Sequence, residues 1–402
     1  MNLLKEHCYS ALWLSVWVTF LLLTGCNANY EAMAKKRIDY ARNNTGKIVI
    51  AAIGDSNHSQ YINGIKLAVE EINESEKGLL GRPLELSIKP AASDVSAAKS
   101  LIRRIASNPE VSLVLGHSSD KVVLRASALY EQSKLLFFPP LSQTKELTSH
   151  GYLFTFRMLP DNTHMAEQIS NEIQAAGYKQ IAVLNSHMDQ QRQLSLVFQG
   201  AATKSGLNIV YTHSFFADMM DYRALLSGLK DKSFDAVFLS ADERSAARLI
   251  HQMREMGIDK PVFGSNELNS EGFITAIGMS EHKTIVPSIY DISAKNWVNQ
   301  HFVARYRGKY HQTPNADAAQ GYDSVMLFAN KVIKAQTTQP DILASTIRFS
   351  QPWRGVTGCY SFNKKGELKN KRFYFQVLNK GIFQPFLITP PLLKAREKTT
   401  CE

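Results

Sequence analysis

Small polar side chains follow two neighbouring apolar runs in the first half of the chain. Ser118 and Ser119 come directly after the apolar run Val111–Leu115, and Ser142 and Gln143 follow a second apolar run shortly afterwards. Hydroxyl groups and backbone N–H groups at the start of a helix can bind an anion such as a carboxylate, although they also cap the helix itself. In an open α/β sheet, small ligands bind at the carboxyl ends of neighbouring strands. The two loops therefore predict a binding site for a small solute.

The first of these loops also raises the question of nucleophilic catalysis. Gly116-His117-Ser118-Ser119, between a predicted strand and a predicted helix, is close to the G-x-S-x-G turn of hydrolases. Asp120 stands where that turn has its final glycine, and the later histidines have no evident acidic partner. No His or Cys spacing in the sequence is typical of a metal site. We therefore expect no enzymatic activity, no metal and no cofactor.

The composition sets the size and the general class of the protein. The 402 residues are enough for two domains, and 44% hydrophobic with 20% charged residues is an ordinary globular balance. The formal net charge is +10, but the Lys and Arg residues are spread along the chain and form no nucleic-acid recognition motif. We interpret the basic balance as a solvated surface and expect no nucleic-acid partner.

The N-terminus predicts the cellular compartment. The apolar run Ala11–Leu23 has 13 residues, which suits a signal peptide but is short for a membrane helix of roughly 20 residues. It is followed by Leu23-Thr24-Gly25-Cys26, which resembles the lipobox of bacterial lipoproteins. Residues 1–25 are then a cleaved signal peptide, Cys26 carries the lipid, and residues 26–46 form a tether. The alternative is an uncleaved anchor, since Tyr9–Gly25 is of borderline length for spanning.

Two further features depend on this periplasmic, lipid-anchored location. Asn27 after the lipidated cysteine favours the outer membrane, by resemblance to enteric lipoproteins. Cys359 and Cys401 can form a disulfide in an oxidising periplasm, but Cys401 lies in a polar tail, so the pair can equally stay open.

The elements that position the two loops alternate along the chain. From Lys47 on, short apolar runs alternate with amphipathic runs in which apolar residues recur every three or four positions. A second series of this kind begins near Met165, and residues 358–386 have the pattern of a β-meander. This rhythm predicts an α/β protein with two Rossmann-like lobes, each built on a parallel sheet.

Several stretches in a fixed order point to one family. They are GIKLAVEEIN from Gly64, GHSS from Gly116, AQGYD from Ala319 and GVTG from Gly355. With these motifs, the chain from Lys47 to about Phe386 resembles the type I periplasmic binding fold, specifically the leucine-binding-like substrate-binding proteins of branched-chain amino acid ABC transporters.

The resemblance implies a domain organisation and a mechanism. The N-terminal lobe comprises residues 47–158 plus about 288–354. The C-terminal lobe comprises 159–287 plus about 355–389, and 390–402 form a tail. A multi-crossing hinge lets the lobes close on a small solute, which is then passed to an inner-membrane ABC permease.

The resemblance also implies roles for individual residues. Ser142 and Gln143 stand where the family has a small residue and then Thr, and Gln190 stands where it has an aromatic residue that covers the ligand. The ligand ammonium is expected to meet Glu267, with Asn266 at the strict match. The loss of the aromatic residue argues against an aliphatic ligand side chain.

A rival function stays open at this point. Some outer-membrane lipoproteins that activate peptidoglycan synthases carry similar domains, and an outer-membrane protein cannot readily deliver a solute to an inner-membrane permease. The fold would then serve as a regulatory or sensor module with a cell-envelope partner.

Overall fold

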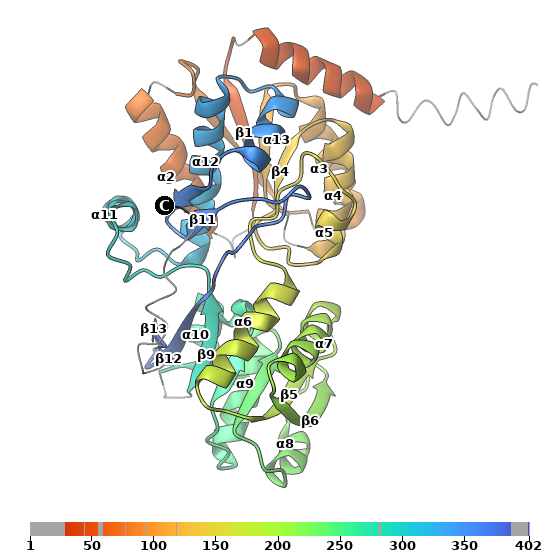
Figure 1. The fold of residues 1–402 in the computed structure, drawn as a ribbon, viewed down its shortest axis with the longest axis vertical. Helices are drawn as coiled ribbons and strands as arrows, with labels where there is room; N and C mark the ends of the chain where they lie inside the picture. Colours follow the sequence, from red (N-terminus) through yellow and green to blue (C-terminus); the bar gives the residue numbers. More distant parts are fainter. Residues whose placement is uncertain are drawn as a thin grey trace, which may run out of the picture.

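The structure is a computed structural model, which describes residues 29–43, 45–54, 59–76, 78–92, 94–117, 119–279, 283–386 and 401. Two α/β lobes lie one above the other along the longest axis of the molecule (Figure 1). Each lobe has a central sheet with helices on both faces, as the alternating sequence pattern predicts.

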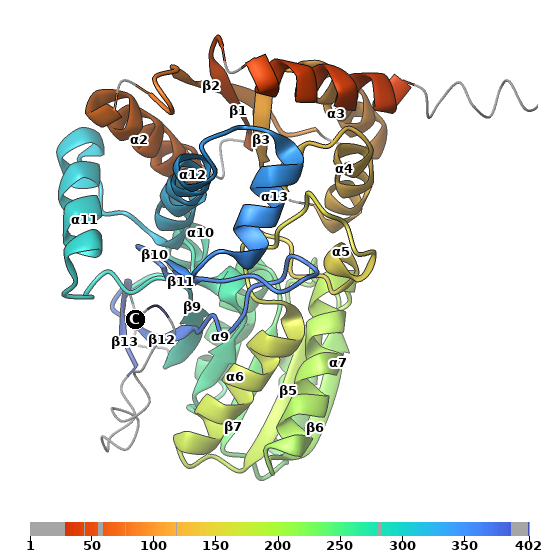
Figure 2. The ribbon, with the colours of Figure 1, turned by 45° about the horizontal axis from the view of Figure 1, so that its top comes forward.

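The first lobe is built on a four-stranded parallel sheet in the order β2-β1-β3-β4. Its strands β1, β3 and β4 are largely apolar and buried, which is typical of a parallel sheet covered by helices, whereas the edge strand β2 is partly exposed. Ile48 and Ile50 of β1 pack toward α2 and α12, whereas Val49 and Ala51 pack toward α3 and α4 (Figure 2). The elements of this lobe are β1 (Ile48–Gly54), α2 (Ser59–Glu76), β2 (Leu84–Pro90), α3 (Val95–Ser107), β3 (Val111–Leu115), α4 (Asp120–Gln132), β4 (Leu136–Phe138), α5 (Glu146–Ser149), α11 (Trp297–Tyr310), α12 (Ala316–Ala335) and α13 (Pro340–Phe349).

The second lobe has a seven-stranded sheet in the order β13-β12-β9-β8-β7-β5-β6. The strands β6 to β9 run parallel to β5, while β12 and β13 join the far edge in antiparallel pairs. The elements are α6 (Asn162–Ala175), β5 (Gln180–Ser186), α7 (Asp189–Lys204), β6 (Asn208–Phe215), α8 (Arg223–Lys230), β7 (Ala236–Ser240), α9 (Glu243–Glu255), β8 (Val262–Gly264), the 3₁₀ helix η2 (Asn266–Leu268), α10 (Glu271–Ile277), β9 (Thr284–Ser288), β12 (Tyr374–Asn379) and β13 (Ile382–Pro385).

The C-terminal β-meander is only partly as predicted. β12 and β13 form the expected hairpin, but β11 (Gly358–Tyr360) pairs instead with β10 (Trp353–Gly355) in a small separate sheet. Tyr360 and Phe362 are buried in the core of the first lobe. The chain therefore enters the second lobe after Leu368, later than the boundary near residue 354 that the family resemblance implied.

Both sheets change strand order at a point that faces the other lobe. In the first sheet β1 lies between β2 and β3, and in the second β5 lies between β6 and β7, so successive strands are added on opposite sides. The loops at the carboxyl ends of strands beside such a switch point form a crevice in open α/β sheets. This topology brings the polar loops after β3, β5, β7 and β8 to the junction between the lobes.

The segment predicted to be a tether is largely a helix that is docked on the first lobe. Residues 29–43 are helical, and Arg37 of this helix is buried. The Arg37 guanidinium donates hydrogen bonds to the carbonyl oxygens of Val111 at 3.0 Å, Ala106 at 2.8 Å and Asn108 at 3.0 Å. These bonds satisfy a cation that burial would otherwise penalise, so the helix is a fixed part of the lobe.

Candidate ligand-binding site

The first polar loop leaves β3 along a narrow path. Gly116 has a φ of +133°, and a Cβ at this position would lie 2.4 Å from the carbonyl oxygen of Ile53 in β1, so glycine is required there. His117 is buried with its Nε2 3.2 Å from the Tyr130 hydroxyl oxygen. Burial lowers the pKa of His117 to about 4, so the imidazole is neutral at pH 7. His117 is therefore part of the packing, and the loop starts from a fixed position.

Of the two serines of this loop, which are both candidate site residues, the structure describes only Ser119. Ser118 lies outside the described residues. Ser119 is exposed at the N-cap of α4, and its side chain makes no capping hydrogen bond. Helix capping therefore does not account for the Ser119 hydroxyl, and binding through this group stays a prediction.

Asp120, the first residue of α4, is a site residue that the sequence reasoning missed. Its Oδ1 accepts a hydrogen bond from Ser142 Oγ at 2.7 Å. Burial raises the pKa of Asp120, while the bond from Ser142 and the charge of Arg157 oppose that rise. The Ser142 hydroxyl, expected to bind the anionic end of a ligand, thus donates to a carboxylate of the protein.

Gln143 connects the second polar loop to the segment that crosses between the lobes. Its side chain is buried, and Nε2 donates to the carbonyl oxygen of Pro160 at 3.3 Å and lies 3.6 Å from the sulfur of Met165. Arg157, also buried, donates to the carbonyl oxygen of Thr144 at 2.7 Å. The side-chain amide of Gln143, a candidate site residue, is thus hydrogen-bonded within the protein at the start of the first crossing.

Glu267 is the central acid of the second lobe. It is half-buried in η2, directly after β8, and its Oε2 accepts a hydrogen bond from Gln191 Nε2 at 2.9 Å. The pKa of Glu267 is raised to about 6, mainly by loss of solvent; the hydrogen bond from Gln191 opposes this rise, and the charges of Asp242, Asp120 and Glu243 contribute to it. Because Asp120 belongs to the first lobe, the pKa of Glu267 depends on charges from both lobes.

The glutamine that reaches Glu267 is one residue away from the predicted one. Gln190 is half-buried in the first turn of α7 and Gln191 is buried. The buried face of α7 includes Gln191, Leu194, Ser195, Phe198, Ala201 and Ala202, at steps of three and one that define one side of a helix. This periodicity is visible in the sequence and identifies Gln191 as the inward residue. Alignment with the family's aromatic position points to Gln190 instead.

A row of small polar residues crosses the carboxyl edge of the second sheet. The strand register places Asn185 of β5 beside Ser240 of β7, and Leu239 beside Gly264, so that Ser265 follows next to Ser240. The hydroxyls of Ser240 and Ser265 are buried and have no hydrogen-bond partner among the described residues. Buried hydroxyls without partners are costly, so this edge is suited to contact with a polar molecule.

Asn266 stands next to Glu267 and was the alternative partner for a ligand ammonium. It is half-buried, and its Oδ1 is shielded from solvent without a hydrogen-bond donor. Both residues proposed from this loop are therefore in the junction region. Glu267 accepts a hydrogen bond from Gln191, whereas Asn266 Oδ1 has no hydrogen-bond donor among the described residues.

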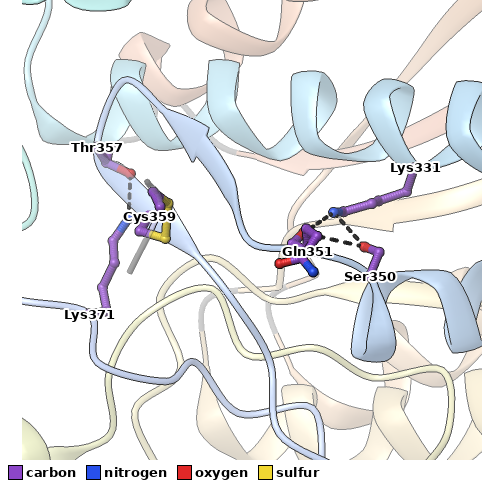
Figure 3. The surroundings of a disulfide bond; sticks show 7 residues. Lys331, Ser350, Gln351, Thr357, Cys359 and Lys371 are labelled. Atoms are coloured by element: carbon purple, nitrogen blue, oxygen red, sulfur yellow. Dashed lines mark hydrogen bonds between the residues drawn. A yellow bond between two sulfur atoms is a disulfide. The ribbon is translucent and has the colours of Figure 1, made fainter. Parts of the chain in front are cut away.

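Two of the cysteines singled out in the sequence form a disulfide outside the candidate site. Cys359 of β11 and Cys401 are joined in a disulfide with a Cα–Cα distance of 5.9 Å, close to the buried Lys371 (Figure 3). The predicted lipidation site Cys26 lies outside the described residues.

Two properties of the described part of the chain bear on the class of protein. Within it, no helix has both the length and the apolar character that a membrane span requires. Within the same residues, no three His, Cys, Asp or Glu side chains are arranged to hold a metal ion.

Comparison with known proteins agrees with the fold. Residues 52–381 match the model of the periplasmic binding protein family. The leucine-, isoleucine-, valine-, threonine- and alanine-binding protein of Pseudomonas aeruginosa is 25% identical over 328 residues, which are 81% of this chain and 85% of that protein. The branched-chain amino acid transporter substrate binding protein LivJ from Streptococcus pneumoniae, solved with isoleucine, is 26% identical with a TM-score of 0.74 and covers 84% of this chain and 98% of its own.

A further structure shows that the fold accepts other solutes. An ABC transporter solute binding protein from R. palustris, in complex with benzoate, has a TM-score of 0.70 at 16% identity and covers 85% of this chain and 95% of its own. These relatives are substrate-binding proteins of transporters and not enzymes. The family model spans most of the chain and both lobes have the expected sheets. The chain therefore belongs to the periplasmic binding protein family and has its type I fold.

Proposed function

We propose that the protein is the solute receptor of an ABC importer and binds an amino acid between its two lobes. The observation that carries this proposal is the position of Glu267. This carboxylate is half-buried at the end of β8, close enough to Asp120 of the opposite lobe for the two charges to interact. A carboxylate removed from solvent needs a cationic or hydrogen-bonding partner, and the ammonium group of an amino acid supplies both.

Binding works by closure of the lobes. In the described state the lobes are in contact, since Gln60 of α2 donates a hydrogen bond to Glu271 of α10. A solute that touches Asp120 on one lobe and Glu267 on the other favours this closed form over an open one, because only the closed form makes both sets of contacts. The closed form is then the one that an inner-membrane permease receives.

The names of the relatives support the ligand class without fixing the ligand. The Pseudomonas aeruginosa protein binds leucine, isoleucine, valine, threonine and alanine, and the Streptococcus pneumoniae protein was solved with isoleucine. The R. palustris protein has the same fold and was solved with benzoate. The side chains of this chain's own cleft must therefore decide the solute.

The proposal includes a lipid anchor on Cys26. The apolar run Ala11–Leu23 and the sequence Leu23-Thr24-Gly25-Cys26 support cleavage before Cys26 and acylation of its thiol. Two or three acyl chains hold a protein firmly on a membrane leaflet, whereas one chain binds only marginally. Growth with labelled palmitate should label the wild-type protein and leave Cys26→Ala unlabelled; an unlabelled wild-type protein would remove the anchor from the account.

A second function, a regulatory module without a small ligand, is favoured by one specific observation. Both candidate carboxylates already have a partner in the protein, Gln191 for Glu267 and Ser142 for Asp120. A cleft that closes on itself in this way can present a fixed surface to a cell-envelope protein. Asn27 after the lipidated cysteine, which favours the outer membrane, agrees with this role.

Titration calorimetry separates the two functions. The protein is unfolded in denaturant and refolded to remove any solute acquired from the host, then titrated with each of the common L-amino acids. At least one should bind, and Glu267→Gln should bind it at least roughly tenfold more weakly, because a hydrogen bond to a charged group is worth about 1.5–3 kcal/mol. No heat with any amino acid would contradict the receptor function and favour the regulatory one.

A further inference from the structure

Four carboxylates gather where the lobes meet. Asp120 belongs to α4 of the first lobe, whereas Asp242, Glu243 and Glu267 lie at the carboxyl ends of β7 and β8 in the second. All four are half-buried, and the other three all act on Glu267 as repelling charges. The whole chain carries a net charge of +10, so this concentration of negative charge runs against the overall balance. Like charges held together out of solvent are stabilised by a cation between them.

Gln191 provides an independent observation beside these acids. Its side chain is only 6% exposed, and its Nε2 is used in the bond to Glu267. The other end of the amide, Oε1, is buried without any hydrogen-bond donor. An amide oxygen can only accept hydrogen bonds, so this atom requires an N–H or O–H group that the described residues do not supply.

Two more open acceptors lie close by. Asp242 Oδ1 caps α9 by accepting from the Ser245 N–H at 3.1 Å, while its Oδ2 is buried and has no partner. Asn266 Oδ1 is open in the same way. With Gln191 Oε1, the second lobe thus offers three unpartnered acceptor oxygens around Glu267. The hydroxyls of Ser240 and Ser265 can either donate or accept a hydrogen bond, but neither is bonded to these three oxygens.

An aliphatic side chain is a poor match for this surface. Pressed against Gln191 and Asp242, it would exclude water and leave their oxygens buried without donors, and each such group is costly. The sequence also has glutamine where the family places an aromatic cover, so no apolar wall is expected from Gln190. A side chain with several N–H donors and a positive charge satisfies the acceptors and the carboxylates together.

We propose that the solute is a basic amino acid, with one cationic group between Asp120 and Glu267 and its other N–H donors on the open oxygens of Gln191, Asp242 and Asn266. This inference rests on the proposed receptor function and names the class of its ligand. The recognition chemistry is a donor-rich cation, which a diamine shares with a basic amino acid.

The test is a calorimetric comparison on the full mature chain. L-arginine and L-lysine are titrated beside L-glutamine and L-leucine, with putrescine as a diamine without a carboxylate. Arginine or lysine should bind at least roughly tenfold more tightly than leucine, and glutamine should fall between them, because a charge-assisted hydrogen bond is about twice as strong as a neutral one. Asp120→Asn and Glu267→Gln should each weaken binding of the basic amino acid at least roughly tenfold.

A matched variant controls for net charge. Asp218→Asn removes one negative charge from an exposed site in the same lobe and should leave the affinity unchanged. Thermal unfolding of each variant shows that it is folded before it is titrated.

Each outcome separates the inference from the function on which it rests. If leucine or another neutral amino acid binds more tightly than arginine and lysine, the inference is wrong and the receptor function stands. If putrescine binds more tightly than every amino acid, the cation site stands and the amino acid is replaced by a diamine. If none of the probes or the remaining amino acids bind, the receptor function fails, and the inference fails with it.

Discussion

Two buried polar clusters in this molecule are completed in opposite ways. In the first lobe, Asp323 is fully buried and accepts hydrogen bonds from the N–H of Val356 at 2.7 Å and from the N–H and Oγ1 of Thr357 at 2.8 and 2.7 Å. Lys371 then donates to Thr357 Oγ1 at 2.7 Å (Figure 3). Its ammonium also lies 3.8 Å from the centre of the Tyr360 ring. The charges of this cluster have their partners inside the protein.

The cluster around Glu267 is incomplete by comparison. Glu267 accepts a hydrogen bond from Gln191, and Gln191 Oε1, Asp242 Oδ2 and Asn266 Oδ1 have no donor among the described residues. A closed network such as that of Asp323 fixes one arrangement of the core. An open set of acceptors at the junction of two lobes is complete only when another molecule supplies the donors. The difference distinguishes a polar cluster that maintains the fold from one that is suited to binding.

The largest expected loss of stability comes from a substitution in the buried cluster around Asp323. Asp323→Ala leaves Lys371 buried without its negative partner and removes the acceptor of two backbone N–H groups. Removing one charge from a buried network while the opposite charge stays buried costs about 3–5 kcal/mol, so the free energy of unfolding in urea should fall by about that amount.

Asp341→Ala is the matched control for this measurement. Asp341 pairs with Lys134 at 3.0 Å, but both side chains are substantially exposed, and such pairs contribute about 0–1 kcal/mol. An equal decrease in the free energy of unfolding in the two variants would mean that burial of the Asp323 cluster adds nothing to its contribution to stability.

The disulfide beside the closed cluster should have the next largest effect. Cys359 and Cys401 are separated by 42 positions, and the chain-entropy model gives roughly 3–4 kcal/mol for a loop of this size. Cys401→Ser should lower the melting temperature, and a reductant should lower that of the wild-type protein to the same value. A reductant effect that persists in Cys401→Ser would show that the bond is not its target.

Substitution of Glu267, in the incomplete cluster, should raise the free energy of unfolding instead of lowering it, and by a smaller amount. The folded protein raises the pKa of Glu267 from 4.5 to about 6, so it binds this proton more tightly than the unfolded chain does. The contribution of Glu267 to stability therefore decreases as the pH rises through this interval, by about 2 kcal/mol at 1.4 kcal/mol per pH unit. Glu267→Gln stays neutral, so without ligand it should be more stable than wild type at pH 8 by up to about 2 kcal/mol.

The pH dependence supplies the check on that prediction. Near pH 4 the wild-type Glu267 is protonated in both states, and the advantage of Glu267→Gln should disappear. Urea unfolding of both proteins at pH 4, 6 and 8 measures the difference directly. A constant difference at all three values would show that ionisation of Glu267 does not cause it.

Much of the fold could be predicted from local patterns. The strand Val111–Leu115 coincides with the apolar run identified in the sequence, and helices and strands alternate as the sequence pattern predicts. β9 was missed, because Pro287 is unfavourable inside a strand. In the structure Pro287 lies beyond the last pair that β9 makes with β8 and opposes Phe375 of β12. The position of β11 was missed because pairing partners are not encoded locally.

The sequence predicted which loops carry the candidate residues but not the contacts of those residues. Ser142 follows β4 and Glu267 follows β8, and their role in binding stays a prediction. The bond from Ser142 to Asp120 depends on how two loops approach each other, which no pattern in the sequence states. Gln191, and not the predicted Gln190, points inward, because the buried face of the helix decides which residue does so and the family alignment does not.

The proposed site is best tested by a crystal structure of the protein grown with L-arginine. We expect one bound molecule between the lobes, with a cationic nitrogen within hydrogen-bonding distance of both Asp120 and Glu267 and a further donor on Gln191 Oε1. A cleft that holds only water, or an arginine bound elsewhere on the surface, would contradict it.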